Sequence, residues 1–549
     1  MTEPGAMGGW TRSKTWFFAL LFAAWMLPGL VGRDPWKADE AYSFGLVLNM
    51  SQSGDWVVPT LGSDPFMEKP PIFYLTATLF ERLLSWALQP HEAARGACVL
   101  FAGLTLLFAA LAGRELYGRG GGRTSALLLM GAVGLVHTAH MLQTDLALVA
   151  GYAMAIYGLT LALRRPWAGG IICGTGTGLA FLSKGLLGPG ALGVAVLLLP
   201  VFGQNWRGRN YGQLLAGILL AVLPWVTVWP ALLYQRSPSL FVDWFWNNNV
   251  ARLVGGSPYA GPEHRPAWFY ATLLCGFGFP VFPLALWGLW RGGRKMLGEP
   301  AVQAVLLPCV TLFLVLSAAS QKRSLYATPL LVPLALLGVR GLAALGERFA
   351  RGAMWFVGGL GTLAAGLAWL GWCAVAAGWP PALLQRIHSA TPHFTTALWP
   401  VALVGAVAGT AGWVILLRSR AETGPPALAF RWAGATALLY LLGMTLWLPV
   451  TNGSSSYRFD FAGLREAAGE SPGLMSCVGL GEPQRAMVHY YTGLKPLRAE
   501  THEKLETKWQ LIQGGDREGK RPRPPGPGWK LAWSGRHQQE LFSLYHLEP

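Results

Sequence analysis

Lys37-Ala38-Asp39-Glu40-Ala41-Tyr42 opens a polar loop that separates the first apolar stretch of this chain, residues 15–31, from many further apolar stretches. The loop continues with Ser53-Gly54-Asp55-Trp56-Val57-Val58-Pro59 and with Met67-Glu68-Lys69-Pro70-Pro71-Ile72-Phe73-Tyr74. Charged side chains are costly beside a bilayer, so charges that gather at its edge usually act on something polar. The loop therefore predicts a membrane protein with a polar site at one surface.

The composition of the chain is that of a membrane protein. Of its 549 residues, 52% are hydrophobic and 13% are charged, whereas a soluble domain carries about 25% charged residues. The chain also has 26 Trp and 70 Gly, which favour the membrane interface and close helix packing. Its net charge of +16 does not indicate nucleic acid as a partner, because the basic residues lie in short loops between apolar segments. The six cysteines show neither a disulfide framework nor a metal-binding spacing.

Apolar segments of roughly 17–25 residues predict a mostly α-helical, polytopic protein with about thirteen membrane spans. These are residues 15–31, 95–113, 124–141, 146–163, 168–183, 187–203, 212–234, 267–290, 301–319, 325–343, 353–377, 397–417 and 427–449. Alternate short loops are basic, which places them in the cytoplasm. The loop 32–94, the other connections and the tail from Thr451 then lie on the outer side. No small-residue cleavage site follows the first span, so an uncleaved helix is expected there instead of a signal peptide.

Two domains are predicted from this pattern. Residues 1–450 form the membrane domain, whose outer loop 32–94 includes an interfacial helix at Ile72–Leu88. Residues 451–549 form a small α/β domain on the outer side. Within it, helices are expected at Phe459–Glu470, Pro483–Tyr491 and Thr501–Ile512, strands at Leu474–Leu480, Trp529–Trp533 and Leu541–His546, and a flexible loop at Gly514–Gly528.

Three acidic residues on the outer side are candidate catalytic groups. Asp39 and Glu40 directly follow the first span, and a carboxylate at the edge of an apolar surface suits a general base. Adjacent side chains point apart, so only one of this pair is expected to face a site; the alternative is two solvated loop acids. Asp145 opens the fourth span, where an N-cap is the simpler explanation of its position, although one residue can serve both purposes.

Cationic residues on the outer side break the positive-inside pattern and so require partners. Lys69 precedes two stiff prolines and suits a phosphate. Lys184, Lys322 and Arg323 interrupt apolar surroundings, where a substrate phosphate or an anionic headgroup would pair with them and snorkelling is the alternative. Arg252 follows a run of aromatic and Asn residues, which suits a sugar phosphate or a lipid carrier but also an interfacial aromatic belt.

Metal and nucleotide sites have little support in the sequence. Glu68 with His264 could be a metal pair, but two ligands do not establish a site. His137 and His140 have the spacing of two ligands and lack a third. The Gly120-Gly121-Gly122 run has no strand before it, so no phosphate-binding loop is predicted. We expect no required cofactor.

The order of these motifs resembles the bacterial members of the protein O-mannosyltransferase-like family, which includes the lipid A aminoarabinose transferases. The resemblance rests on Asp39-Glu40, on the SGDW-V-P element at 53–59, on the EKPP element at 68–71 and on the later Asp145. The Ser-Lys-Gly turn at 183–185 and the Lys-Arg-x-x-Tyr element at 322–326 are also similar. The resemblance covers the whole membrane part and implies a GT-C glycosyltransferase whose sugar arrives on a polyprenyl phosphate.

The resemblance also implies roles for individual residues. Asp39 would be the catalytic acid–base residue, and Asp145 would support it. The carrier phosphate would be held by Lys69, Arg252 and Arg323, with Lys184, Lys322 and Tyr326 in the same group. Glu68 and His264 match positions near a structural metal, zinc, in the aminoarabinose enzymes. Those enzymes read Asp-Glu-x-Arg-Tyr, whereas this chain reads Asp39-Glu40-Ala41-Tyr42 without an Arg, which leaves the sugar open.

The expected function is that of an inverting glycosyltransferase in a bacterial inner membrane, with a periplasmic active site and C-terminus. A lipid-linked donor explains a site at the bilayer edge, and Asp39 would take the proton of an envelope acceptor such as lipid A, another glycan or a lipid. A protein O-glycosyltransferase and a flippase of lipid-linked sugars are the alternatives. The flippase would need charges within the spans. Membrane lipids are the remaining partners, and a monomer is expected.

Overall fold

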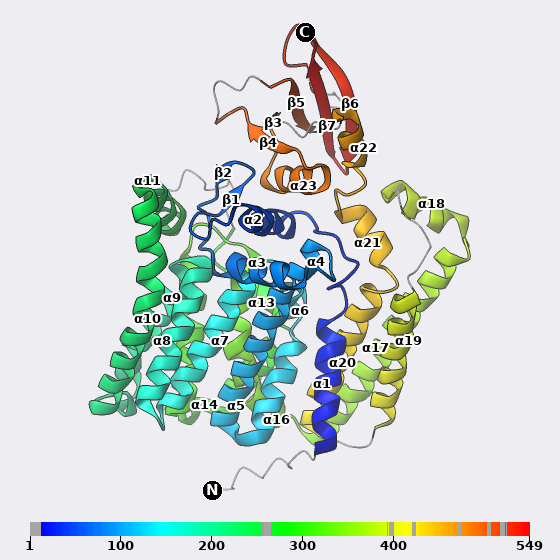
Figure 1. Cartoon of the computed structure of the whole chain (residues 1–549). Helices are drawn as coiled ribbons and strands as arrows, with labels where there is room; N and C mark the ends of the chain where they lie inside the picture. The colour runs from blue at the N-terminus through cyan, green and yellow to red at the C-terminus, as the bar shows by residue number, and fades with distance from the viewer. Residues whose placement is uncertain are drawn as a thin grey trace.

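The computed structural model describes residues 12–254, 256, 265–391, 394, 400–419, 424–469, 474–501, 507–515, 522 and 524–548. A bundle of long helices makes up most of the molecule, and a small sheet stands at one end of it (Figure 1). Between the bundle and the sheet lie short helices that run across the ends of the long ones. This intermediate layer contains the loop 32–94 of the sequence.

Within the described residues, seven helices are long and apolar enough to cross a membrane, or nine if each of two bent pairs counts as one span. The protein is therefore a multi-pass membrane protein, but the expected number of about thirteen spans is not reproduced. The seven are α5 with α4 (Pro90–Met130), α7 (Asp145–Ala162), α10 (Arg209–Arg236), α15 (Pro300–Ala318), η3 with α16 (Ser324–Ala343), α17 (Glu347–Ala376) and α19 (Pro400–Arg418). The bent pairs are α13 with α14 (Phe269–Phe277 and Val281–Leu297) and α20 with α21 (Pro425–Gly443 and Leu448–Ser455).

One physical reason for the smaller number is the helix α5 (Gly96–Met130), which contains two of the expected spans. Gly118 in its middle has φ 76°, a left-handed conformation that ends one helix and begins the next. A Cβ at Gly113 would collide with Ser125, so the two halves pack against each other like a hairpin. Other expected spans fall on α1 (Arg12–Met26), α8 (Pro166–Lys184) and α9 (Leu187–Phe202), which are short or rich in Gly.

The intermediate layer consists of α2 (Asp39–Ser53), α3 (Ile72–Leu84), α4 (Pro90–Ala94) and the two-stranded sheet of β1 (Thr60–Leu61) and β2 (Asp64–Pro65). The helix α2 is buried along nearly its whole length, because the bundle covers one side and α23 (Glu482–Thr492) covers the other (Figure 1). A Cβ at Gly45 would meet Ala486 of α23 at 2.5 Å. The expected interfacial helix at 72–88 is present as α3.

The sheet at the end of the bundle has five strands in the order β4-β3-β5-β7-β6. They are β3 (Leu474–Val478), β4 (Lys495–Arg498), β5 (Trp509–Gly515), β6 (Trp529–His537) and β7 (Glu540–Leu547). The first three pair in parallel, and β5-β7-β6 are antiparallel. The short α22 (Ala462–Ala468) packs against β6. The mixed α/β character is as expected, while the domain boundary at 450 stays a prediction.

The expected helix at Thr501–Ile512 is wrong in its last part, because β5 begins at Trp509. The local residues favour helix, but this segment lies between β3 and β7 and pairs with both. Leu511 is fully buried in that position. Tertiary packing overrides helix propensity here. The strand β4 was not expected, since Lys495–Arg498 is short and not alternating.

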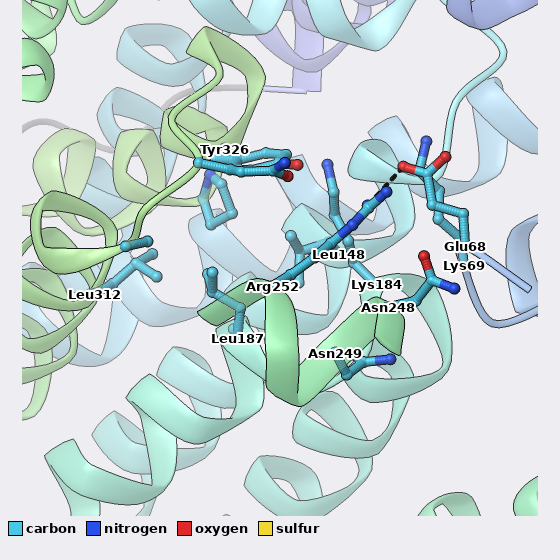
Figure 2. A pocket seen from close by; sticks show the side chains of 14 residues that line it. Glu68, Lys69, Leu148, Lys184, Leu187, Asn248, Asn249, Arg252, Leu312 and Tyr326 are labelled. Carbon is cyan, nitrogen blue, oxygen red and sulfur yellow. Dashed lines mark hydrogen bonds and ion pairs between the residues drawn. The ribbon is translucent and has the colours of Figure 1, made fainter. Parts of the chain in front are cut away.

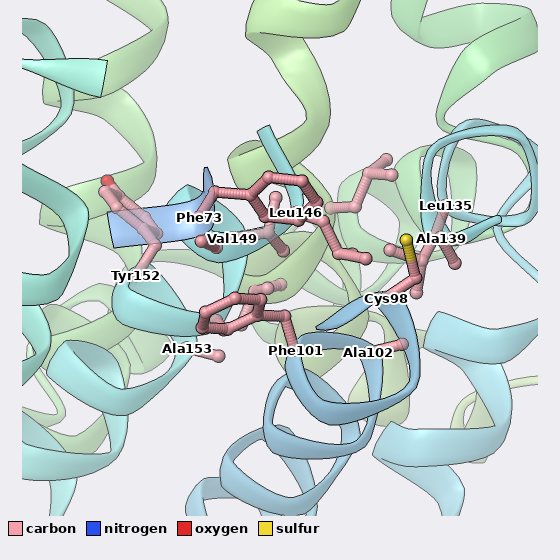
Figure 3. Close-up of a cluster of buried hydrophobic side chains, with 14 of the residues drawn as sticks. Phe73, Cys98, Phe101, Ala102, Leu135, Ala139, Leu146, Val149, Tyr152 and Ala153 are labelled. Atoms are coloured by element: carbon pink, nitrogen blue, oxygen red, sulfur yellow. The ribbon is translucent and has the colours of Figure 1, made fainter. Parts of the chain in front are cut away.

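A buried apolar cluster joins the intermediate layer to the bundle (Figure 3). Phe73 of α3 stacks on Phe101 of α5 with ring centroids 5.8 Å apart. Leu135 of α6 (Val133–Ala139) and Leu146 of α7 lie in the same cluster. The hydroxyl of Tyr152 donates to the carbonyl of Pro308, 2.6 Å away. Close packing of this kind transmits little movement, so the layer sits on a rigid base.

The remaining described helices are short. They are η1 (Gln204–Trp206), α11 (Pro238–Val242), a π-helix at Asp243–Val250, α12 (Ala251–Val254) and α18 (Pro381–Ala390). Only 11% of the most apolar stretch of α19 is buried inside the protein. Such a helix presents its apolar surface to lipid.

Candidate active site

A pocket lies where the bundle meets the intermediate layer, and Figure 2 shows the side chains that line it. Its polar wall brings together side chains that are far apart in the sequence: Glu68, Lys69, Lys184, Asn248, Asn249, Arg252, Gln321 and Tyr326. Its apolar wall comes from α7, α9 and α15, with Leu148, Leu187 and Leu312. A pocket with a cationic wall and an apolar wall matches a molecule that has an anionic head and a hydrocarbon chain.

Glu68 and Lys69 reach the pocket from the segment before α3, where Pro70 and Pro71 stiffen the backbone. The guanidinium of Arg252 donates to the Glu68 carboxylate over 2.9 Å. Burial raises the pKa of Glu68, but the nearby charges of Lys69 and Arg252 outweigh it and lower the pKa to about 2. Glu68 is therefore ionised at neutral pH; it orients Arg252 and lies close enough to Lys69 to favour its charge.

Lys69 is buried, and its ammonium donates to the hydroxyl of Tyr42 on α2. The same nitrogen lies 4.9 Å from the centre of the Tyr42 ring. Burial acts to lower the pKa of Lys69, but the Glu68 charge outweighs it and raises the pKa. Lys69 thus keeps its charge although it is removed from water. Tyr42 was not identified from the sequence as part of the site.

Asp145 begins the helix α7 and is only 2% exposed. Its carboxylate accepts from the ammonium of Lys184, the last residue of α8. Lys184 also lies 4.3 Å from the centre of the Tyr326 ring. The N-cap of α7 is Thr144, so the expected capping role of Asp145 is wrong: its carboxylate is engaged by a cation that lines the pocket and does not cap the helix.

Asp39 is the first residue of α2 and is half-buried. Among the described residues, its carboxylate takes part in no hydrogen bond or ion pair. It does not line the pocket, but it lies near enough to add to the effect of Glu68 in raising the pKa of Lys69. Asp39 is therefore an unpaired carboxylate beside a group of cations.

Glu40 has entirely different surroundings. Its carboxylate is fully buried and accepts from Arg33 over 2.8 Å and from Arg95 over 3.0 Å. Burial raises the pKa of Glu40, but the two guanidinium groups outweigh it and lower the pKa. This environment fits an anchoring role better than the catalytic role that the sequence suggested. The expectation that only one of the acidic pair faces a site agrees with this geometry.

The two remaining predicted cations, Arg323 and Lys322, have different surroundings. Arg323 is exposed; burial acts to lower its pKa, but Tyr326, Glu68 and Asp39 together raise it, which places Arg323 near the pocket group. Lys322 is buried, donates to the carbonyl of Ala319 over 2.8 Å and does not line the pocket. Its geometry supports the local backbone and gives no contact to the phosphate-binding group.

The predicted metal site of Glu68 and His264 stays a prediction, because His264 lies outside the described residues. Glu68, its partner in that prediction, is already engaged by Arg252. Among the residues that the structure describes, no group of three or more His, Cys, Asp or Glu could hold a metal ion. His140 has backbone carbonyls at both ring nitrogens, those of Val136 at 2.7 Å and Trp25 at 2.6 Å.

Two further parts of the site were not found by sequence reasoning. Glu482, the first residue of α23, is near the pocket group: burial raises its pKa, and the Glu68 charge raises it further. No motif connects Glu482 to the loop 32–94, which lies some 400 residues away. Asn249 on the π-helix accepts from the backbone N–H of Leu186 over 3.1 Å, and it fixes the segment that carries Arg252. The run of Asn residues gave a signal for this segment.

Comparison with known proteins gives relatives of one kind. Residues 68–229 match the sequence family described as dolichyl-phosphate-mannose-protein mannosyltransferase. The chain is 28% identical over 495 residues to the undecaprenyl phosphate-alpha-4-amino-4-deoxy-L-arabinose arabinosyl transferase of Serratia proteamaculans, covering 86% of this chain and 82% of that protein. It is 30% identical over 368 residues to the corresponding transferase 1 of Sodalis glossinidius, covering 63% of this chain and 60% of that one.

The fold is shared with a solved structure. The crystal structure of ArnT from Cupriavidus metallidurans bound to undecaprenyl phosphate superposes with a TM-score of 0.69 over 98% of both chains, at 18% sequence identity. This likeness confirms the predicted architecture of a helical membrane bundle with a small α/β region at one end.

Proposed function

We propose that this chain, a GT-C glycosyltransferase of the aminoarabinose-transferase-like family, moves a sugar from a polyprenyl phosphate carrier to an acceptor in the cell envelope. The observation that carries the proposal is the pocket in which Lys69, Lys184 and Arg252 converge above an apolar wall. Its relatives from Serratia and Sodalis are named for undecaprenyl phosphate, which has such an anionic head and a long hydrocarbon chain. We take undecaprenyl phosphate as the carrier.

The cations of the pocket act on the leaving group. Breaking the bond between the sugar and the carrier phosphate leaves negative charge on a phosphate oxygen. Cations placed in advance at that oxygen, in surroundings with little water, stabilise the developing charge. Arg252 is itself oriented by Glu68, Lys69 by the hydroxyl of Tyr42, and Lys184 by Asp145. These partners hold the cations in place and leave part of their charge for the phosphate.

Asp39 is the proposed general base. A carboxylate without a partner is free to accept the proton of an acceptor hydroxyl as that hydroxyl attacks the anomeric carbon. A single displacement from the side opposite the phosphate inverts the anomeric centre and forms no covalent sugar–enzyme intermediate. Asp39 lies at the end of the bundle and the phosphate cations lie beside it, which suits attack from the aqueous side.

The location and the acceptor are also part of the proposal. Basic short loops place the opposite end of the bundle in the cytoplasm, so the site faces the periplasm of a bacterial inner membrane. We propose a lipid or glycan acceptor such as lipid A, because the site opens at the bilayer edge. The sugar itself is left open, since Tyr42 stands in the segment where the aminoarabinose enzymes carry an Arg.

The test is mass spectrometry of envelope glycolipids and glycoproteins from cells that have the gene, that lack it, and that lack it but express Asp39→Asn. A sugar mass that is lost on deletion and not restored by Asp39→Asn supports a transferase with Asp39 at its centre. The molecule that carries this mass identifies the acceptor. As a matched control, Glu115→Gln changes an acid on the opposite side of the bundle, paired with Arg164, and should restore the mass.

Two outcomes would count against the proposal. If Asp39→Asn fully restores the lost mass, Asp39 is not the base. If deletion changes the distribution of the lipid-linked sugar across the membrane while every glycoside is still formed, the protein is a flippase. A mass lost from a glycoprotein instead of a glycolipid would replace the acceptor by a protein hydroxyl.

A further inference from the structure

The position of Asp39 depends on its backbone, because its carboxylate has no partner of its own among the described residues. Two contacts flank it. On its C-terminal side, Glu40 is fixed by Arg33 and Arg95. On its N-terminal side, Lys37 is paired with Glu540, the first residue of β7 in the C-terminal sheet, over 2.7 Å. The second contact comes from a part of the chain that no sequence pattern linked to the site.

Glu540 is itself held rigidly. One carboxylate oxygen accepts from the hydroxyl of Tyr457 over 2.9 Å, and the other accepts from the amide of Gln484 over 2.8 Å and from Lys37. Tyr457 is fully buried and stacks on Phe461 with ring centroids 5.2 Å apart. A carboxylate held by two donors from two other segments is pre-organised to receive the lysine.

The backbone before Asp39 is attached to the same region of the chain. The N–H of Lys37 donates to the carbonyl of Ser455 over 3.1 Å. The indole of Trp36 and the N–H of Asp34 both donate to the side chain of Asn452, over 2.9 and 3.2 Å. The approach to α2 is thus built jointly by the loop and by residues that follow the last span.

From this geometry we propose that Glu540 is a positioning residue for Asp39. It acts through Lys37, touches no substrate, and makes the C-terminal sheet a working part of the active site. The inference rests on the proposed role of Asp39 as general base. A base must lie within hydrogen-bonding reach of the proton that it takes, and a misplacement of about 1 Å can cost 10²-fold in rate.

The experiment uses full-length variants purified in detergent and added in equal amounts to membranes of the deletion strain, which supply donor and acceptor together. The initial rate of sugar transfer, followed against the amount of membrane, gives an apparent kcat and KM. Glu540→Gln should lower kcat roughly tenfold and leave KM unchanged, because the change affects the base and not the phosphate cations. Its melting temperature should stay within a few degrees of the wild type.

Two further variants separate positioning from general support. The exchange of charges in Lys37→Glu with Glu540→Lys should recover most of the lost kcat, since Gln484 has a free carbonyl oxygen to accept from the new lysine. Glu548→Gln, which breaks the exposed pair with Lys530 on the same sheet, should have full activity.

The possible results decide the matter. Full kcat in Glu540→Gln overturns the inference and leaves the proposed function intact. The inference is also overturned if Glu540→Gln lowers both kcat and the melting temperature, and the exchange of charges restores neither. That result would indicate structural support only. If the wild-type protein itself restores no transfer, the proposed function fails, and the inference fails with it.

Discussion

Asp39 and Glu40 are neighbours in the sequence, yet the regions that surround them use charge in opposite ways. Around Glu40, the donors of Arg95 reach the carbonyls of Leu30, Arg33 and Asp34 as well as the carboxylate. In the pocket beside Asp39, Arg252 is bound by a single carboxylate, and its Nε has no hydrogen-bond partner within the part of the chain that the structure describes. A cationic side chain that stabilises the fold has its hydrogen-bond donors paired within the protein. A cationic side chain that binds a ligand keeps some of its donors free.

The sharpest test of this comparison is Asp39→Asn. Because removal of a general base typically costs 10²–10⁴-fold, we expect kcat to fall by roughly 10³-fold. The melting temperature should be unchanged, since Asp39 has no partner to lose. Single-turnover transfer measured on the purified variant checks both statements. A large drop in stability would contradict the view of Asp39 as an unpaired group.

Glu40→Gln should show the reverse pattern. It leaves Arg33 and Arg95 buried without a counter-charge, and breaking a buried pair in this way costs roughly 3–5 kcal/mol in the free energy of unfolding. Denaturation of the detergent-solubilised protein measures this loss. If Glu40→Gln instead folds as stably as the wild type and is inactive, Glu40 belongs to the catalytic group and the comparison breaks down.

Arg252→Ala examines the pocket side of the comparison. Charge-assisted hydrogen bonds contribute about 1.5–3 kcal/mol, so the apparent KM for the lipid-linked donor should rise roughly 10- to 100-fold. The control is Arg458→Ala, which removes an exposed arginine 3.7 Å from the carboxylate of the buried Asp34 and should leave KM unaltered. Equal effects of the two variants would mean that the pocket is not the phosphate site.

The pH dependence of stability gives the smallest effect. The pKa of Glu68 is lowered from its ordinary 4.5 to about 2, so its pairing with Lys69 and Arg252 stabilises the folded state fully above the ordinary value. That contribution is lost as the pH falls through the lowered pKa. The difference in melting temperature between wild type and Glu68→Gln should therefore be constant between about pH 8 and pH 5 and shrink below pH 4. No difference at neutral pH, or a wild type that melts below Glu68→Gln, would indicate an unpaired Glu68.

The sequence predicted the parts of the site that belong to local motifs. Glu68 and Lys69 were identified by the prolines that follow them, and Lys184 and Arg252 by their charge in apolar or aromatic surroundings. Four of these predicted residues meet in one pocket, together with Tyr326. The membrane architecture followed from apolar segments long enough to span a bilayer.

The sequence did not predict the partners of these residues. Arg33 and Arg95 bind Glu40, and Glu482 and Glu540 approach the loop from the far end of the chain. Such pairings depend on which helices meet in space, and no spacing rule reports that. The expected helix at Thr501–Ile512 failed for the same reason, because strand partners decide the conformation of β5.

The pair of Lys37 and Glu540 joins residues 503 positions apart. During translation, the loop before α2 leaves the ribosome first, but it acquires this contact only after β7 has been synthesised. A chain released early lacks the hairpin of β6 and β7 and with it the residue that orients the catalytic loop. Under our proposal, such a chain would transfer sugar roughly tenfold more slowly, so unfinished chains in the membrane would consume the lipid-linked donor only slowly.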